Sequence, residues 1–401
     1  MTAGTADQTF VARLGLVTRY GLARVAPAVA GIVIVPLVLA ALGPETYGRY
    51  SIYLGLALLI ASLASALITQ PMYRFLASDG GLEAMYRAGA WMLAGLAGLV
   101  TGAVILMTAD RLDAAVAFGL LATASVACAH LSVSLQIAGR PGRLALMETV
   151  RAILLIAFLA LQADRLSLVG AALAQAGAAA LALVLFNRGY ALRAPGAAMT
   201  GMLAYGAKSA LWLVLAGSPL TIVKAVLLRV GPAAEAGALA ALLDLAYRAC
   251  ALVNSAVTMA IFPALSRAYD QGRFGELRRS LAFGICVYFG CAVALLAAGW
   301  GLLRLSGEGG AGLTGIGPAT TLLAAAACLA LQAMSVSHKP YELRLQTGWM
   351  TAKLALCLLP LGVAVLAVFA GHGPAAPLLL ASIFVPTAYY CVSGAMLGWR
   401  R

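Results

Sequence analysis

The chain has 401 residues, of which 63% are hydrophobic and only 10% are charged. Soluble domains have roughly 45–50% apolar and about 25% charged residues, so this composition excludes an ordinary soluble enzyme or binding domain. The mean hydropathy of +0.96 and the formal charge of +13 indicate an integral membrane protein with basic loops. In such a protein the charge does not predict a nucleic-acid partner, and none is expected.

Apolar stretches long enough to cross a bilayer recur along the whole chain. A hydrocarbon core about 30 Å thick requires about 20 apolar residues per helix, and the alternating pattern of a membrane barrel strand is absent from the sequence. We therefore expect an all-α polytopic membrane protein with twelve spans. The predicted spans are residues 20–42, 47–76, 88–108, 114–138, 146–163, 165–187, 203–228, 233–265, 280–303, 317–337, 348–370 and 376–398.

The basic residues predict the orientation of these spans. With the N-terminus in the cytoplasm, most of the 27 Lys and Arg residues fall in cytoplasmic loops, as the positive-inside rule requires. Both termini are then cytoplasmic, and the protein is expected to lie in the cytoplasmic (inner) membrane. The first apolar stretch follows three arginines and lacks a small-residue cleavage site, so no signal peptide is expected.

A loop near the middle of the chain, NRGYALRAPGAAMTG (residues 187–201), divides it into two predicted six-helix lobes, 1–195 and 196–401. The two lobes share a faint repeat, since Gly-Pro ends span one at residues 43–44 and span seven at residues 231–232. Glycine permits a reversal that proline then enforces, so each pair predicts a tight turn between antiparallel spans. A repeat of this kind predicts two lobes around a V-shaped central cavity, which is typical of transporters that rock about a central site.

The sequence lacks the motifs of a soluble active site. We find no nucleophile elbow, zinc-protease motif, phosphate loop or usefully spaced pair of carboxylates, and no loop large enough to hold a catalytic site. We therefore expect neither enzyme activity nor a cofactor. The seven cysteines all fall within predicted spans and are expected to be small packing residues without a disulfide or metal role.

Span eight carries the strongest polar signal. Asp244, Tyr247, Arg248 and Asn254 recur at helical spacing on an otherwise apolar helix, and ionisable groups at membrane depth usually face a cavity or a partner. Asp244 precedes Arg248 by four residues, which favours an ion pair on one helix face. Two interpretations stay open: a self-neutralised pair that holds helices together, or a cavity wall whose arginine holds an anion. Asp244 is also the only carboxylate that we place deep in the bilayer, which makes it the candidate for a coupling proton.

The positively charged residues in the other spans do not distinguish a cavity position from a position near the membrane surface. Arg24 in span one and Lys224 in span seven either line the cavity or extend toward the membrane surface. Arg151, near the inner surface, is expected to extend its head into water in that way. Gln70 and Gln136 near inner span ends either bind sugar hydroxyls or form interhelical hydrogen bonds, as does a third glutamine at 332.

Three segments carry a family resemblance: GPETYGRYS (43–51), QIAGRPGRLALMETVRAIL (136–154) and FPALSRAYDQGRFGELRRSL (262–281). Together with Arg24 and Arg74 they resemble bacterial polysaccharide and O-antigen flippases of the multidrug/oligosaccharidyl-lipid/polysaccharide exporter superfamily. The resemblance implies a two-lobed flippase that moves an undecaprenyl-diphosphate-linked oligosaccharide from the cytoplasmic to the periplasmic leaflet by alternating access. Its partners would be the lipid-linked oligosaccharide, membrane lipid and the machinery of polysaccharide polymerisation or export.

The resemblance carries over Arg24 as a cavity residue, whereas Arg248, Lys224, Tyr247 and Asn254 are substrate-binding candidates from the residues alone. The alternative within the same superfamily is a multidrug/cation antiporter. Antiporters of this kind usually carry acidic residues in the cavity, whereas the candidate cavity residues of this chain are mainly cationic. Two further classes stay open: a membrane-embedded glycosyltransferase or ligase, and a static scaffold for a biosynthetic complex.

Overall fold

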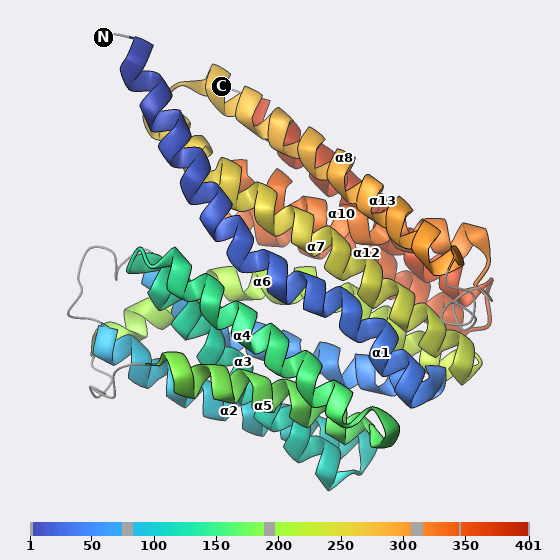
Figure 1. Cartoon of the computed structure of the whole chain (residues 1–401). Helices are drawn as coiled ribbons and strands as arrows, with labels where there is room; N and C mark the ends of the chain where they lie inside the picture. The colour runs from blue at the N-terminus through green and yellow to red at the C-terminus, as the bar shows by residue number, and fades with distance from the viewer. Residues whose placement is uncertain (1–2, 74–82, 188–196, 306–315, 345, 400–401) are drawn as a thin grey trace.

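The computed structural model describes residues 3–73, 83–187, 197–305, 316–344 and 346–399; the side chains of residues 3–24 and of a few later positions lie outside this description. Every regular element in the described ranges is helical, which confirms the predicted all-α class (Figure 1). The helices are α1 (Ala3–Pro71), α2 (Glu83–Ala109), α3 (Leu112–Ile137), α4 (Pro141–Leu161), η3 (Ala163–Arg165), α5 (Leu168–Phe186), α6 (Ala197–Val230), α7 (Ala233–Asp270), α8 (Phe274–Leu305), α10 (Pro318–Ser337), α11 (Lys339–Leu343), α12 (Thr347–Phe369) and α13 (Ala375–Trp399).

The first helix provides two spans. A continuous helix of its 69 residues would be roughly 100 Å long, about three times the thickness of a bilayer core. Gly43 breaks it with φ 73° and ψ 163°, a conformation that is essentially restricted to glycine. Eleven described helices are long and apolar enough to cross a membrane, so the break in α1 gives twelve spans. The predicted number and order of spans are confirmed.

Much of the surface is apolar. Leu99, Met107, Leu161 and Val184 are 75%, 87%, 83% and 74% exposed. Such side chains would form large apolar patches in water, but in a bilayer they face lipid tails, to which they are well matched. The chain is therefore a multi-pass membrane protein.

The helices form two lobes, as predicted. In Figure 1 the N-terminal half (α1–α5) lies below the C-terminal half (α6–α13), with the first part of α1 running between them. The kink in α1 and the turn between α6 and α7 lie at one end of the bundle, which we call the kink end. The described N- and C-terminal helix ends lie at the other, which we call the terminal end. The predicted boundary at residues 195/196 touches residues 188–196, which lie outside the described part, and stays a prediction.

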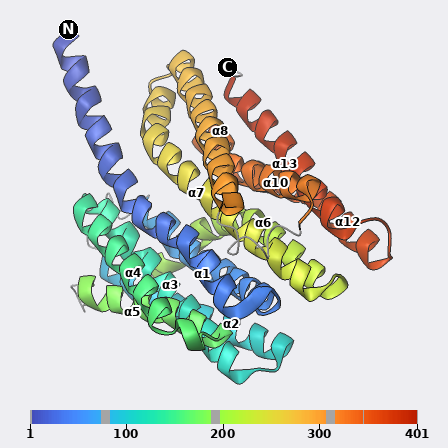
Figure 2. The same ribbon diagram turned by 45° about the vertical axis from the view of Figure 1, so that its right-hand side comes forward.

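Glycines bring the two halves close together. A Cβ atom on Gly55 would lie 2.7 Å from Oγ1 of Thr221, and one on Gly206 would lie 2.5 Å from the backbone oxygen of Leu67. The second part of α1 and α6 therefore pack closely at both positions, with direct backbone contact at Gly206, as small residues allow in membrane helix pairs. By contrast, Figure 2 shows the first part of α1 separating from α7 toward the N-terminus.

Candidate functional site

A cavity of about 520 Å³ lies between α1, α3, α4, α5 and α7. Its volume is within the range of small-molecule sites. Its wall combines aliphatic side chains with amides and hydroxyls. The uncharged polar groups in the wall include Gln70, Tyr73, Ser125, Ser132, Gln136 and Gln175.

Arg248 is the described lining residue that comes from the C-terminal half. Its Nη1 atom donates a hydrogen bond of 3.2 Å to the backbone oxygen of Gly31 in α1. A Cβ atom on Gly31 would lie 3.2 Å from the same nitrogen, so the absence of a side chain there makes room for the guanidinium. Because arginine has five N–H donors and this bond uses one, the guanidinium retains donors for a ligand in the cavity.

A partly buried ion pair on α4, in which the Arg151 side chain is 31% exposed, forms another part of the wall. Arg151 lies 2.7 Å from Glu148, whose side chain is 2% exposed, and Ser132 donates a hydrogen bond of 3.2 Å to the same carboxylate. Both charged residues line the cavity. The prediction that Arg151 extends into water is therefore wrong, and Asp244 is not the only buried carboxylate. The three-residue spacing of Glu148 and Arg151 at the start of a span was the sequence signal for this pair.

Asp244 forms its ion pair with Lys224 of α6, and the predicted pair with Arg248 is wrong. Tyr47 and Ser51 of α1 also donate hydrogen bonds to the Asp244 carboxylate, at 2.9 and 2.6 Å. Lys224 is 6% exposed and lies outside the described lining of the cavity. A buried ammonium requires a partner, and the carboxylate on the adjacent helix is that partner, which leaves Arg248 to extend toward α1.

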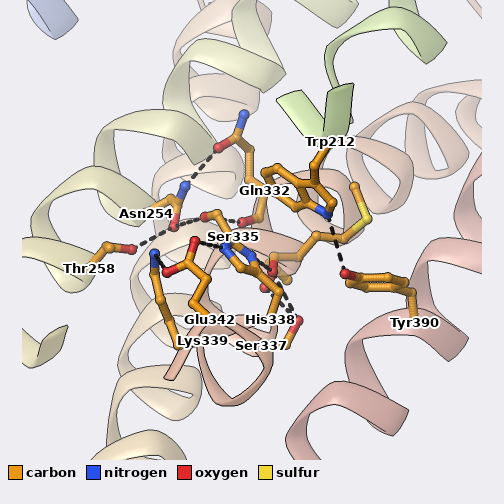
Figure 3. Close-up of polar contacts among 12 residues, drawn as sticks. Trp212, Asn254, Thr258, Gln332, Ser335, Ser337, His338, Lys339, Glu342 and Tyr390 are labelled. Atoms are coloured by element: carbon orange, nitrogen blue, oxygen red, sulfur yellow. Dashed lines mark hydrogen bonds and ion pairs between the residues drawn. The ribbon is translucent and has the colours of Figure 1, made fainter. Parts of the chain in front are cut away.

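Asn254 belongs to a polar cluster in the C-terminal half (Figure 3). Its amide nitrogen donates to Oε1 of Gln332 at 2.9 Å, while its oxygen accepts from Ser335 at 2.6 Å and from Thr258 at 3.2 Å. These bonds join α7 to α10, so Gln332 forms the interhelical hydrogen bond that was one of its two predicted uses. Tyr247, half-buried on the same helix, packs against the hydrophobic core. Neither Asn254 nor Tyr247 is among the described residues that line the cavity.

A second set of polar contacts in Figure 3 lies where α10 meets α11. The Nε2 atom of His338 lies 2.7 Å from Glu342, and Lys339 donates to the same carboxylate at 2.7 Å. The Nδ1 atom of His338 lies 2.6 Å from the backbone oxygen of Met334. Because these groups satisfy one another, they stabilise the junction between the two helices.

The remaining candidates are placed as follows. Gln70 and Gln136 line the cavity, and Gln136 accepts a hydrogen bond of 2.5 Å from Tyr73. Arg24 lies in α1, but its side chain falls outside the described residues. Within the described ranges no group of three or more His, Cys, Asp or Glu side chains is placed to hold a metal ion.

No protein-family model matches the sequence, and the comparison with curated proteins gives no match. Solved structures do match over almost the whole length. An outward-facing multidrug resistance MATE family transporter of the MOP superfamily aligns with a TM-score of 0.62 and 14% identity, covering 96% of this chain and 94% of its own. The chain has the fold of the MATE transporters.

Two further solved structures show the same likeness. An inward-facing multidrug resistance MATE transporter aligns with a TM-score of 0.61 and 15% identity, covering 97% of each chain. A MOP superfamily transporter from Pyrococcus furiosus, for which the reverse polarity of the binding pocket suggests a different function, aligns with a TM-score of 0.62 and 13% identity, covering 96% and 94%. At this level of identity the likeness establishes the MATE fold and its two lobes.

Proposed function

We propose that this protein is a transporter of the MOP superfamily that works by alternating access, with the described cavity as its substrate site. The position of Arg248 carries the proposal. Its guanidinium extends from the C-terminal half to a carbonyl oxygen of the N-terminal half, in a cavity whose other described walls belong to the N-terminal half. A substrate bound to Arg248 would therefore touch both halves, and a movement of one against the other would expose it to the opposite side.

The charges in the wall favour an anionic group on the cargo. Glu148 is neutralised by Arg151 at 2.7 Å, whereas Arg248 has a backbone oxygen as its described partner. A cation entering the cavity would have to compete with Arg151 for Glu148, while an anion would find unused guanidinium donors. The mixture of aliphatic and polar walls further favours an amphipathic molecule.

Of the two cargo classes considered from the sequence, the shared fold favours a multidrug-type exporter over a flippase for lipid-linked oligosaccharides. Structures with this fold include multidrug resistance transporters in outward-facing and inward-facing states. We therefore propose export of amphipathic small molecules as the main function, with a preference for anions because of Arg248.

A specific observation keeps the flippase as the second candidate. Three glutamines, two serines and a tyrosine line the same cavity as Arg248, and amide and hydroxyl groups are well suited to hydrogen-bond sugar hydroxyls. The guanidinium would bind the diphosphate of the lipid carrier in the same cavity. In this case the protein would lie in the inner membrane and work together with polysaccharide polymerisation or export machinery.

Deletion of the gene distinguishes the two classes. The exporter predicts increased sensitivity to anionic amphipathic compounds with an unchanged pool of lipid-linked oligosaccharides. The flippase predicts complete, undecaprenyl-linked repeat units that accumulate on the cytoplasmic leaflet, measured by mass spectrometry and by access of periplasmic enzymes. In either case wild type should restore the phenotype and Arg248→Gln should not. If deletion changes neither the drug sensitivity nor the lipid pool, the transporter proposal is wrong.

We also propose Asp244 as the coupling residue. A proton on its carboxylate would remove the charge that accepts the hydrogen bonds of Tyr47 and Ser51, so the stability of this contact between the halves would depend on pH. Asp244→Asn should abolish the pH dependence of transport. If the pH profile of transport remains that of wild type in this variant, Asp244 has no coupling role.

A further inference from the structure

The two halves are in direct contact at the kink end. A Cβ atom on Gly237 of α7 would lie only 1.7 Å from the backbone oxygen of Pro44 in α1, a distance that no pair of non-bonded atoms adopts. The two backbones therefore touch. Asp244 lies seven residues further along α7, which corresponds to about 10 Å along the helix.

Asp244 joins the halves at this second level. Its ion-pair partner Lys224 belongs to the C-terminal half, whereas the hydroxyls of Tyr47 and Ser51 belong to the N-terminal half. Tyr47, Ser51 and Lys224 are buried, with exposures of 1%, 1% and 6%. The hydroxyls of one half thus bind a carboxylate of the other in a site from which water is largely excluded.

Arg248 lies one helical turn from Asp244, about 6 Å closer to the terminal end. Because Arg248 lines the cavity, the Asp244 cluster lies on the kink-end side of this arginine. Gln175, which also lines the cavity, donates a hydrogen bond to Tyr50 beside the cluster. Three polar lining residues, Gln70, Tyr73 and Gln136, lie instead near helix ends at the terminal end. The cavity therefore extends to the terminal end, whereas at the kink end the two halves touch where Gly237 meets Pro44.

We propose that Asp244, with Tyr47 and Ser51, is the latch that holds the kink end closed; this inference rests on the proposed alternating-access function. Opening of the kink end separates the two hydroxyls from the carboxylate. Lys224 and Asp244 move together because both belong to the C-terminal half, so opening leaves no unpaired charge in the bilayer. In the closed state, the charge of Lys224 keeps the Asp244 carboxylate ionised, so it accepts strong hydrogen bonds from Tyr47 and Ser51. In the open state, Lys224 still neutralises Asp244. The hydroxyls can therefore leave and rebind, and the latch is reversible.

Thiol labelling of a cavity residue tests the latch without any substrate. Ser125 lines the cavity, and Ser125→Cys changes its size little. The background protein carries alanine at the two exposed native cysteines, Cys286 and Cys291. A membrane-impermeant maleimide is added to sealed vesicles of known orientation, from the side of the kink end, and the rate of labelling is measured.

The principal variant is Tyr47→Phe/Ser51→Ala, which removes the bonds between the halves and leaves the Lys224–Asp244 pair intact. The second variant is Asp244→Asn, which weakens the whole cluster. The control is Asp113→Asn, which breaks an exposed ion pair with Arg111 inside the N-terminal half. Circular dichroism and gel filtration verify that each variant is folded.

We expect the labelling rate from the kink end to rise by about tenfold or more in both latch variants, because a hydrogen bond to a charged acceptor contributes about a factor of ten to an equilibrium. The control should label at the wild-type rate. Wild-type rates in the folded double variant overturn the latch, even if transport is observed. Rates that rise as expected support the latch even if no substrate is found, so its failure is distinguishable from failure of the proposed function.

Discussion

Gly48 and Gly237 lie against each other across the interface between the two halves: a Cβ atom on Gly48 would be 3.1 Å from the Cα atom of Gly237. Each is the glycine that follows a Gly-Pro pair, at residues 43–44 and 231–232. The faint sequence repeat therefore has a structural meaning, because its two copies meet at the kink end. Both copies need a glycine because Gly48 packs directly against Gly237.

Gly237→Ala should disrupt this contact. The added methyl group cannot occupy a position 1.7 Å from the Pro44 oxygen, so α1 and α7 must separate at the kink end, at a cost of about 1–3 kcal/mol. Thermal unfolding in detergent should show the loss. Gly290→Ala is the matched control, since a Cβ atom there meets nothing within 4 Å. Equal melting temperatures for the two variants would contradict the packing described.

Gly43→Ala should also be destabilising, but through the backbone alone. A Cβ atom at Gly43 meets nothing within 4 Å, while φ is +73°, and forcing a non-glycine residue into that region costs on the order of 1–3 kcal/mol. Gly95→Ala, at an open position in α2 with ordinary helical geometry, should be neutral or stabilising. The difference between the two melting temperatures measures the contribution of the break, and no difference would mean that the break does not require glycine.

The Glu148–Arg151 pair should be strongly coupled. Glu148→Gln leaves a cavity arginine without its carboxylate, and Arg151→Gln leaves a carboxylate with 2% exposure without its cation. Removing Arg151 alone is the more costly change, because it leaves the buried Glu148 carboxylate unpaired, whereas Arg151 is 31% exposed. A double-mutant cycle in detergent should give a coupling energy on the order of 1–3 kcal/mol, and strictly additive losses would show that the two charges do not interact.

Asn254 distinguishes a structural role from a substrate-binding role. Asn254→Ala removes the amide donor to the buried Gln332, and an unsatisfied buried polar group costs about 1–3 kcal/mol. We expect lower stability with an unchanged KM for transport. An increase in KM at unchanged stability would instead show that Asn254 binds substrate, as its place on the polar face of span eight predicts.

The sequence predicts the spans because each is determined locally. An apolar stretch of the required length becomes a helix in the bilayer wherever it occurs, and Gly43-Pro44 marks a position where two spans join without a conventional loop. Every predicted span therefore has a described helix in the expected order. The position of Arg248 in a cavity wall agrees with one of the two interpretations made from the sequence.

The partners of the charged residues were harder to predict. The spacing of Asp244 and Arg248 favours a pair on one helix, but tertiary packing brings Lys224 of a neighbouring helix to Asp244. Which faces of two helices meet depends on the packing of the whole bundle, and hydropathy carries no information about it. The pair of Glu148 and Arg151, in contrast, was accessible from the motif METVR, because charges three residues apart at the start of a span meet on one helix face.

We propose that Arg248 binds an anionic group of the cargo in the cavity between the halves. The most direct measurement is transport of matched anionic and cationic amphipathic probes into sealed proteoliposomes by wild type, Arg248→Lys, Arg248→Gln and, as a control, Arg111→Gln at an exposed position. We predict saturable transport of the anionic probe, a loss in kcat/KM of about 30-fold or more in Arg248→Gln, partial activity in Arg248→Lys and wild-type activity in the control. Preferential transport of the cationic probe, with Arg248→Gln as active as wild type, would show that Arg248 does not bind the cargo.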